Sequence, residues 1–282
     1  MHQNTSSIGA FTQIEAPGLV TPVAAAADIP CGHAGETDLL LDLYRPAKPP
    51  AQPLPAVIFI HGGGWHGGDK ESYRDLAARA ASHGYVCASA DYRVSGEAKF
   101  PAALEDCKCA VRWLRAHAAD LHADPNRFAT WGHSAGAHLA AMVALTPGKF
   151  EGAGGWAEHS SQVQCALCYS APLDFAALGQ GLKGSLDLFL GDARGHVNPR
   201  EQASPINYVS EASPPFFICH GAQDDLVPVD QSERFVAALR NVGAPVEFIR
   251  VADAGHDLER HSENIFAAAL TFLDRYLKQP AA

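Results

Sequence analysis

The sequence predicts a single α/β domain built on a mostly parallel central β-sheet with helices on both faces. Its 282 residues suit one such domain, since doubly wound sheets reach this size as single units. Short apolar runs alternate with amphipathic segments along the chain, which favours strand–helix–strand units. One apolar run ends in Gly-x-Ser-x-Gly and continues as alanine-rich sequence, the order expected where a strand turns sharply into a helix.

The first half of the chain opens with residues 1–37, which mix Gly, Pro, Ala and polar residues without clear periodicity. We expect this stretch to be an N-terminal extension, with a single domain over 38–282. Fully apolar runs further on are typical of buried parallel strands, and amphipathic segments between them of helices. The expected strands are 39–44, 56–60, 85–90 and 127–131, and the expected helices are 72–83 and 100–119.

The second half continues the alternation but contains two long connections. Residues 146–162 are rich in Gly and polar residues, and residues 172–213 form a longer stretch with scattered aromatic and apolar side chains. Connections of this length inside a compact domain are usually lids or binding loops, although both can simply cover the end of the sheet. The remaining expected strands are 164–170, 216–219 and 246–251, with helices after Ser134, at 230–242 and at 263–277.

Charge and hydropathy exclude several classes of partner. The net charge is −10 and Lys and Arg form no runs, which argues against nucleic acid or an anionic membrane surface as a partner. No stretch of about 18 apolar residues suggests a membrane span. The first nine residues lack the basic and apolar regions of a signal peptide, so we expect a cytoplasmic protein.

The cysteines are expected to be reduced thiols, because their number is odd and several fall inside predicted strands or helices. Cys165 and Cys168 form a C-x-x-C, but in a strand these positions point to opposite faces, which disfavours redox or zinc chemistry. We expect no metal and no cofactor. The seven cysteines are Cys31, Cys87, Cys107, Cys109, Cys165, Cys168 and Cys219.

Ser134 is the candidate nucleophile. It lies at the centre of the Gly-x-Ser-x-Gly, where Gly132 and Gly136 leave room for a strained turn that lifts the hydroxyl clear of the sheet. The backbone N–H of Ala135 would sit at a helix N-terminus, facing the place where an oxyanion forms. The alternative is a serine that merely caps a helix.

Two further residues complete a candidate catalytic set with Ser134. Asp224 and His256 each follow a predicted strand, and the carboxyl ends of parallel strands meet at one edge of a sheet. A serine needs a base to take its proton, and a histidine base needs an acid that fixes its tautomer. The order Ser, Asp, His along the chain is that of hydrolases with a strand–serine–helix turn.

More than one aspartate could serve as the acid that orients His256. Asp224 and Asp225 are adjacent, and we favour Asp224 as the one that points inward. Asp257 follows the histidine directly and, like Asp253, is expected to be a turn residue.

The glycine-dense segment after His61 has two interpretations. Its backbone N–H groups at Gly63 and Gly64 can join that of Ala135 in an oxyanion hole, because glycine lets the main chain approach a substrate oxygen. The segment also matches the dinucleotide fingerprint formally, with Asp91 near the distance of a ribose-binding acid. Bulky side chains inside the motif and a helix that starts only after residue 70 argue against this second interpretation.

Taken together, these segments resemble serine esterases of the α/β-hydrolase superfamily. The similarity is to the branch with His-Gly-Gly-Gly-Trp, shared by hormone-sensitive-lipase-like enzymes and by bacterial feruloyl and acetyl-xylan esterases. It covers roughly residues 38–277. The segments that carry it are 61–65, 91–93, 100–102, 132–140, 203–205, 220–221 with Asp224 and 227–228, and 255–256.

The resemblance implies a triad at Ser134, Asp224 and His256 and an oxyanion hole at Gly63, Gly64 and Ala135. Three positions depart from the family pattern. Gly96 stands where proline is frequent and Ala137 where a second glycine is frequent, and both changes concern loop stiffness. Asp257 follows the histidine where glycine is common, which puts a carboxylate beside the expected base and can shift its pKa or offer a substitute acid.

We therefore expect a carboxylic ester hydrolase that acts through an acyl-enzyme on small, aryl or short-acyl esters. Trp65, Trp156 and Phe189 are candidates to line the substrate pocket, although aromatic residues more often belong to a core. The alternatives are an arylformamidase-type amide hydrolase and a binding protein on a hydrolase scaffold. The expected partner is a small-molecule ester, and a homodimer is the assembly we consider.

Overall fold

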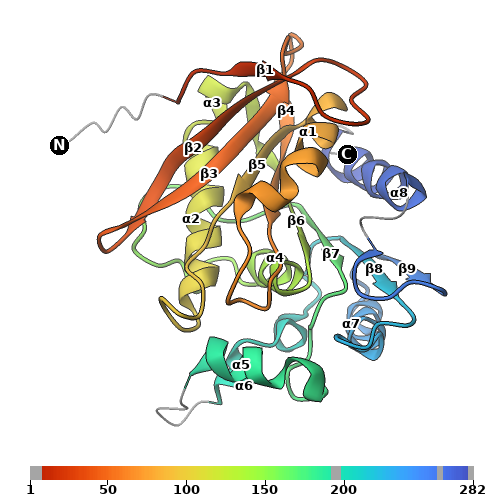
Figure 1. Cartoon of the computed structure of the whole chain (residues 1–282). Helices are drawn as coiled ribbons and strands as arrows, with labels where there is room; N and C mark the ends of the chain where they lie inside the picture. The colour runs from red at the N-terminus through yellow and green to blue at the C-terminus, as the bar shows by residue number, and fades with distance from the viewer. Residues whose placement is uncertain (1–7, 192–197, 259–262, 279–282) are drawn as a thin grey trace.

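A computed structural model describes residues 8–191, 198–258 and 263–278. Within these residues nine strands form one sheet in the order β1-β2-β3-β5-β4-β6-β7-β8-β9, and the six strands from β5 to β9 in this order are parallel (Figure 1). This confirms the predicted mostly parallel sheet. The strands are β1 Thr12–Ile14, β2 Val23–Ala34, β3 Thr37–Pro46, β4 Leu54–Ile60, β5 Val86–Ala90, β6 Ala123–His133, β7 Cys165–Tyr169, β8 Phe216–Gly221 and β9 Val246–Val251.

The N-terminal part of the chain belongs to the sheet. Strands β1, β2 and β3 pair antiparallel, and β3 joins the parallel strands by pairing antiparallel with β5. The extension expected over residues 1–37 therefore differs from the structure, in which the sheet begins at residue 12. Residues 23–34 are rich in alanine and carry two register shifts against β3, so they show no regular alternation that predicts a strand.

Helices cover both faces of the sheet, and each face has its own core. Ile58 and Ile60 of β4 point into the core on the face covered by α2, α4 and α7, whereas Val57 and Phe59 point into the core on the face covered by α1 and α8. A strand buried on both faces is apolar throughout, as β4 is. The helices are α1 Arg74–Ser82, α2 Ala102–Ala116, α3 Ala118–Leu121, α4 Ala135–Leu145, α5 Lys183–Leu190, α6 Pro199–Gln202, α7 Asp230–Asn241 and α8 Glu263–Leu273.

The connection 146–162 is fastened to α2. The buried Lys108 ammonium donates to the carbonyl of Thr146, to that of Lys149 at 2.7 Å and to the Glu151 carboxylate at 3.1 Å. Arg112 also pairs with Glu151, at 2.7 Å. This loop does not line the cleft that contains Ser134. It therefore packs on α2 and does not border the cleft in the way that a lid over Ser134 would.

The connection 172–213 contains helices α5 and α6, which lie beyond the end of the sheet near α4 (Figure 1). Residues 180–182 and 205–208 add short 3-10 turns. Leu182 and Ser185 from this connection line the cleft around Ser134, so one of the two expected lid segments borders the site. Residues 192–197 of the expected segment lie outside the described residues.

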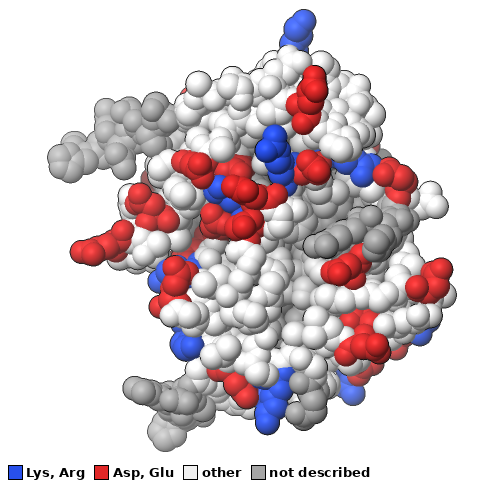
Figure 2. Space-filling view, viewed as in Figure 1, with Lys and Arg blue, Asp and Glu red and all other residues white. Residues whose placement is uncertain are grey.

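Surface charge, the cysteines and the lengths of the helices bear on the partners and environment of the protein. Acidic side chains are spread over the face drawn in Figure 2, and basic side chains stand singly among them. All seven cysteines are buried and free. None of the described helices combines the length and the apolar character needed to span a bilayer.

Candidate active site

Ser134 occupies a strained turn between β6 and α4. Its backbone angles are φ 55° and ψ −123°, a conformation that residues other than glycine adopt only where the surrounding structure imposes it. A Cβ on Gly132 would lie 2.3 Å from the carbonyl oxygen of Gly136, and one on Gly136 would lie 2.0 Å from that of Ile60. The two glycines of the motif are therefore required for the turn that presents Ser134.

His256 joins Ser134 to Asp224 by hydrogen bonds. Its Nε2 lies 2.9 Å from the Ser134 hydroxyl oxygen, and its Nδ1 lies 2.7 Å from Oδ2 of Asp224. The three residues come from the loops after β6, β8 and β9, at the carboxyl edge of the sheet. With the proton on Nδ1, the ring donates to Asp224 and its Nε2 accepts from the serine hydroxyl, which is the tautomer that a general base needs.

Asp224 is buried and fully hydrogen-bonded, whereas its neighbour Asp225 is exposed. Its Oδ1 accepts from the amides of Leu226 at 3.0 Å and Val227 at 2.8 Å. Burial alone would raise the pKa of Asp224, but the hydrogen bonds from His220, His256 and the Val227 amide hold this pKa well below its usual range. Asp224 is therefore ionised whenever the protein is folded near neutral pH, and the choice of Asp224 over Asp225 agrees with the geometry.

A second histidine supports this carboxylate. His220 is fully buried, and its Nε2 donates to Oδ2 of Asp224 at 3.1 Å and to the Val227 carbonyl at 2.8 Å. Its Nδ1 accepts from the Ser232 hydroxyl at 2.7 Å, which fixes the tautomer. His220 is not among the site residues predicted from the sequence. Its position four residues before Asp224, at the end of a buried strand, was the available signal.

The glycine loop after β4 lies against Ser134. A Cβ on Gly62 would lie 3.5 Å from that of Ser134, and Gly63 and Gly64 line the same cleft. Within the described chain, the amides of Gly63 and Gly64 donate to no other residue, so both are available to a ligand oxygen. Asp91, considered above as a ribose-binding acid, instead accepts from the Lys70 amide at 2.8 Å and helps to fix the end of this loop.

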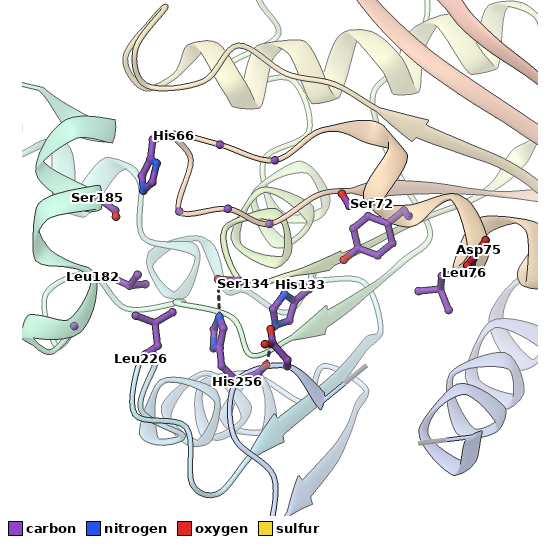
Figure 3. A pocket seen from close by; sticks show the side chains of 18 of the residues that line it. His66, Ser72, Asp75, Leu76, His133, Ser134, Leu182, Ser185, Leu226 and His256 are labelled. Atoms are coloured by element: carbon purple, nitrogen blue, oxygen red, sulfur yellow. Dashed lines mark hydrogen bonds between the residues drawn. The ribbon is translucent and has the colours of Figure 1, made fainter. Parts of the chain in front are cut away.

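Ser134 opens into a cleft of about 980 Å³. Figure 3 shows Ser134 and His256 near its middle, with Leu182, Ser185, Leu226 and His66 on one side and Ser72, Asp75 and Leu76 on the other. The first side has two leucines close to His256. The second side carries the Asp75 carboxylate, and Arg79, Asp257 and Glu263 are further charged residues among those that line the cleft.

The three aromatic residues expected to line the pocket do not do so. Trp65 and Phe189 are buried and stack on each other with their ring centroids 4.8 Å apart. Trp156 belongs to the loop fastened to α2 and donates to the carbonyl of Cys31 at 2.9 Å. Trp65 and Phe189 join the core where the glycine loop meets α5, and Trp156 packs against the same core from its own loop, so all three placements depend on tertiary contacts.

Trp65 also fixes a buried histidine, and this contact predicts a pH dependence of stability. His138 accepts from the Trp65 indole at its Nδ1 (3.1 Å) and donates from Nε2 to the Ala203 carbonyl (2.7 Å), so its neutral form is fully bonded. Burial lowers the pKa of His138 to about 4. Because the unfolded chain takes up the proton first, the free energy of unfolding should fall as the pH drops from about 6.5 towards about 4, by up to about 3 kcal/mol from this residue.

Urea unfolding at about pH 7.5 and about pH 4.5 measures this loss. In His138→Gln the difference between the two pH values should shrink, whereas in His33→Gln, which changes an exposed histidine, it should stay as in the wild type. An equal pH dependence in His138→Gln and the wild type would contradict the role assigned to His138.

His133 is a further residue at the site without a role in the sequence analysis. It lines the cleft beside Ser134, and its Nε2 lies 2.8 Å from the carbonyl oxygen of His256. Burial and repulsion by His256 lower the pKa of His133 to about 4, so this ring is neutral near pH 7.

Among the described residues, no group of His, Cys, Asp and Glu is arranged to hold a metal ion.

Comparison with known proteins points to esterases. The model of the BD-FAE family matches residues 41–239. Esterase LipQ of Mycobacterium tuberculosis is 35% identical over 240 residues, which are 83% of this chain and 57% of LipQ. Carboxylesterase NlhH of the same organism is 34% identical over 133 residues, 47% of this chain and 41% of NlhH. The chain thus spans little more than half the length of LipQ and less than half that of NlhH.

Solved structures agree with these relatives. A thermophilic esterase of the planctomycete Thermogutta terrifontis, Est2, is 28% identical with a TM-score of 0.78, over 94% of this chain and 96% of that one. A truncated carbohydrate esterase from gut microbiota is 25% identical with a TM-score of 0.80, over 90% and 96% of the two chains. Another structure shows the Thermogutta esterase phosphonylated by sarin, with 28% identity and a TM-score of 0.81 over 95% and 99%.

Proposed function

This chain belongs to the BD-FAE family of α/β-hydrolase serine esterases, and we propose that it hydrolyses carboxylic esters with Ser134, His256 and Asp224. The observation that carries the proposal is the hydrogen-bonded chain from the Ser134 hydroxyl through His256 to the buried Asp224 carboxylate. Phosphonylation of the Thermogutta relative by sarin supports the presence of a reactive nucleophile in this fold.

In the first half of the proposed reaction, Ser134 Oγ attacks the ester carbonyl while His256 Nε2 takes the hydroxyl proton. The imidazolium that forms is stabilised by the ionised Asp224. The carbonyl oxygen becomes an oxyanion that accepts from the backbone N–H groups of Gly63, Gly64 and Ala135. The intermediate collapses when His256 returns the proton to the leaving alcohol oxygen, which leaves the acyl group on Ser134.

In the second half, water attacks the acyl-enzyme. His256 takes a proton from the water as its oxygen bonds to the acyl carbon, and the same three amides hold the second oxyanion. Collapse then breaks the bond to Ser134 Oγ, which regains its proton from His256. The products are a carboxylic acid and the free enzyme, so no further reactant is needed.

The cleft supports small, aryl or short-acyl esters as substrates. Leu182 and Leu226 offer a limited apolar surface next to His256, whereas the opposite side of the cleft carries Ser72 and Asp75 beside Leu76. A short apolar acyl or aryl group fits the leucine side without burying charge. Trp65, Trp156 and Phe189 add nothing to this surface, because none of them lines the cleft.

The proposal is tested with p-nitrophenyl acetate, butyrate and octanoate beside an N-formyl aryl amine. We expect the acetate and butyrate to be hydrolysed with the highest kcat/KM. Hydrolysis of the formamide at least as fast as of the acetate would instead assign an arylformamidase-type amide hydrolase. Binding of the esters without turnover, and without labelling by a fluorophosphonate, would assign a binding protein on the same scaffold.

Alanine at Gly63 should damage the oxyanion loop. The residue has φ +108°, and a Cβ there would lie 2.2 Å from the Gly67 carbonyl oxygen, so the loop must move away from Ser134. We expect kcat for p-nitrophenyl acetate to fall about 10²- to 10³-fold, the range typical for loss of an oxyanion donor.

Gly35→Ala is the matched control for this change. Gly35 also has a positive φ, +67°, but lies in the β2–β3 hairpin with nothing near the position of a Cβ. It should cost about 1 kcal/mol of stability through backbone strain and leave kcat unchanged. Equal losses of activity in both variants would refute a specific role for the 63–64 amides.

A further inference from the structure

The backbone carbonyl of His256 accepts two hydrogen bonds from buried side chains. His133 Nε2 donates to this oxygen at 2.8 Å, and the Ser170 hydroxyl donates to it at 2.9 Å. His133 is 8% exposed and Ser170 is fully buried. The donors come from the ends of β6 and β7, two neighbouring strands in the middle of the sheet.

These two bonds attach the middle of the loop after β9, whose start is bonded to β8 and whose Leu258 is buried in the core. The loop after β9 is bonded to the end of β8 through Ala222 and Gln223, whose amides donate to Val251 and Ala254 at 2.8 and 3.0 Å. Within the described chain, the hydrogen bonds that reach a backbone atom of residues 255–257 are the two to the His256 carbonyl. The backbone position of His256 therefore depends on His133 and Ser170.

The geometry joins the two ends of His256 to two consecutive residues. Its ring Nε2 meets the Ser134 hydroxyl at 2.9 Å, and its carbonyl meets the His133 ring at 2.8 Å. Figure 3 shows the His133 and His256 side chains next to each other beside Ser134. The strained turn that sets the direction of Ser134 thus also sets the distance to the backbone of its base.

We propose that His133 and Ser170 are positioning residues, which hold the main chain of His256 so that its ring stays within reach of Ser134. This inference rests on the proposed ester hydrolysis. A base must be in place twice in each turnover, once for the serine proton and once for the water proton, and an error of about 1 Å can cost about 100-fold in rate. Ground-state binding of the ester uses the cleft and does not need the ring, so the effect belongs to kcat.

The test compares His133→Met, which removes the donor, with His133→Gln, whose side-chain amide keeps an N–H at a similar reach. His133→Met and Ser170→Ala should each lower kcat for p-nitrophenyl acetate about 10- to 100-fold with KM nearly unchanged. His133→Gln should recover most of the lost kcat. The double variant His133→Met/Ser170→Ala should lose more than the product of the single losses, because each single variant still keeps one bond to the carbonyl.

Two readouts separate this positioning role from a loss of folding and from failure of the proposed function. Hydrogen exchange of a peptide that covers residues 252–258 should speed up in His133→Met and most in the double variant, whether or not the protein hydrolyses esters. Thermal unfolding monitors the fold. His159→Met, in the loop fastened to α2, is the control histidine and should match the wild type in kcat and exchange.

The proposal is overturned if His133→Met is folded and keeps the wild-type kcat, if its KM rises while kcat is unchanged, or if His133→Gln is as slow as His133→Met. Unchanged exchange of the 252–258 peptide in the double variant would also overturn it. If the wild-type protein is inactive but the variants exchange faster, the proposed ester hydrolysis is refuted. The role of His133 and Ser170 in holding the main chain of His256 is then still supported.

Discussion

Ser134→Ala is expected to lower kcat for p-nitrophenyl acetate by about 10⁴- to 10⁶-fold. The substitution removes the atom that attacks the ester, and the amides at Gly63, Gly64 and Ala135 alone can retain only a small part of the rate enhancement. Alanine and serine both carry a Cβ, so each is strained to a similar extent at the φ of 55°. The unfolding temperature should therefore stay close to that of the wild type.

Labelling by a fluorophosphonate gives an independent measure of the same prediction. The intact mass of the wild-type protein should rise by one adduct, and that of Ser134→Ala should not. Ser72 lines the same cleft but donates its hydroxyl proton to the Asp69 carbonyl, so Ser72→Ala should still form the adduct. An adduct on Ser134→Ala, or equal turnover in both proteins, would show that another residue is the nucleophile.

The second large effect is expected from Asp224→Asn, with kcat lower by about 10⁴-fold. An asparagine keeps an oxygen for the amides of Leu226 and Val227 but presents an N–H₂ group to His256. The histidine then accepts at Nδ1 and carries its proton on Nε2, where it can no longer take the proton of Ser134. The loss should appear in kcat at every pH from about 6 to about 8, because the wrong tautomer persists over this range.

Asp225 and Asp257 offer the matched comparisons for this acid. Asp225 is exposed, and Asp225→Asn should behave like the wild type. Asp257→Asn changes a carboxylate of the cleft and should lose far less activity than Asp224→Asn. A greater loss in Asp257→Asn than in Asp224→Asn would make Asp257 the acid that orients His256. The sequence raised this alternative because Asp257 stands where the family commonly has glycine.

Much of the fold could be predicted because the parallel strands are buried on both faces. The runs at 56–60 and 216–219 are apolar throughout, and α1 and α7 each show an apolar and a polar face. Strand β2 could not be predicted in this way, because its alanines and its register shifts hide the alternation. Its place in the sheet depends on pairing with β3, a tertiary contact.

The candidate site divides in a similar way. Ser134, Asp224 and His256 could be selected from the sequence because each follows a predicted strand, and their mutual distances agree with that selection. His133 and Ser170 could not, since they bond a backbone carbonyl and such contacts leave no spacing rule, whereas His220 stands four residues before Asp224 at the end of a buried strand. Trp65 and Phe189 were misplaced because an aromatic side chain looks the same in a sequence whether it faces a ligand or a core.

Alkylation of the buried cysteines can be used to follow the unfolding of this protein. Burial raises the pKa of Cys87, Cys165 and Cys168 among others, so their thiolates are scarce as well as inaccessible. A thiol reagent meets almost no target in the folded chain and meets all seven thiols when the sheet comes apart. The rate of alkylation therefore reports the population of the open chain when reclosing is faster than alkylation, and the unfolding rate when it is slower, without a chromophore or a substrate.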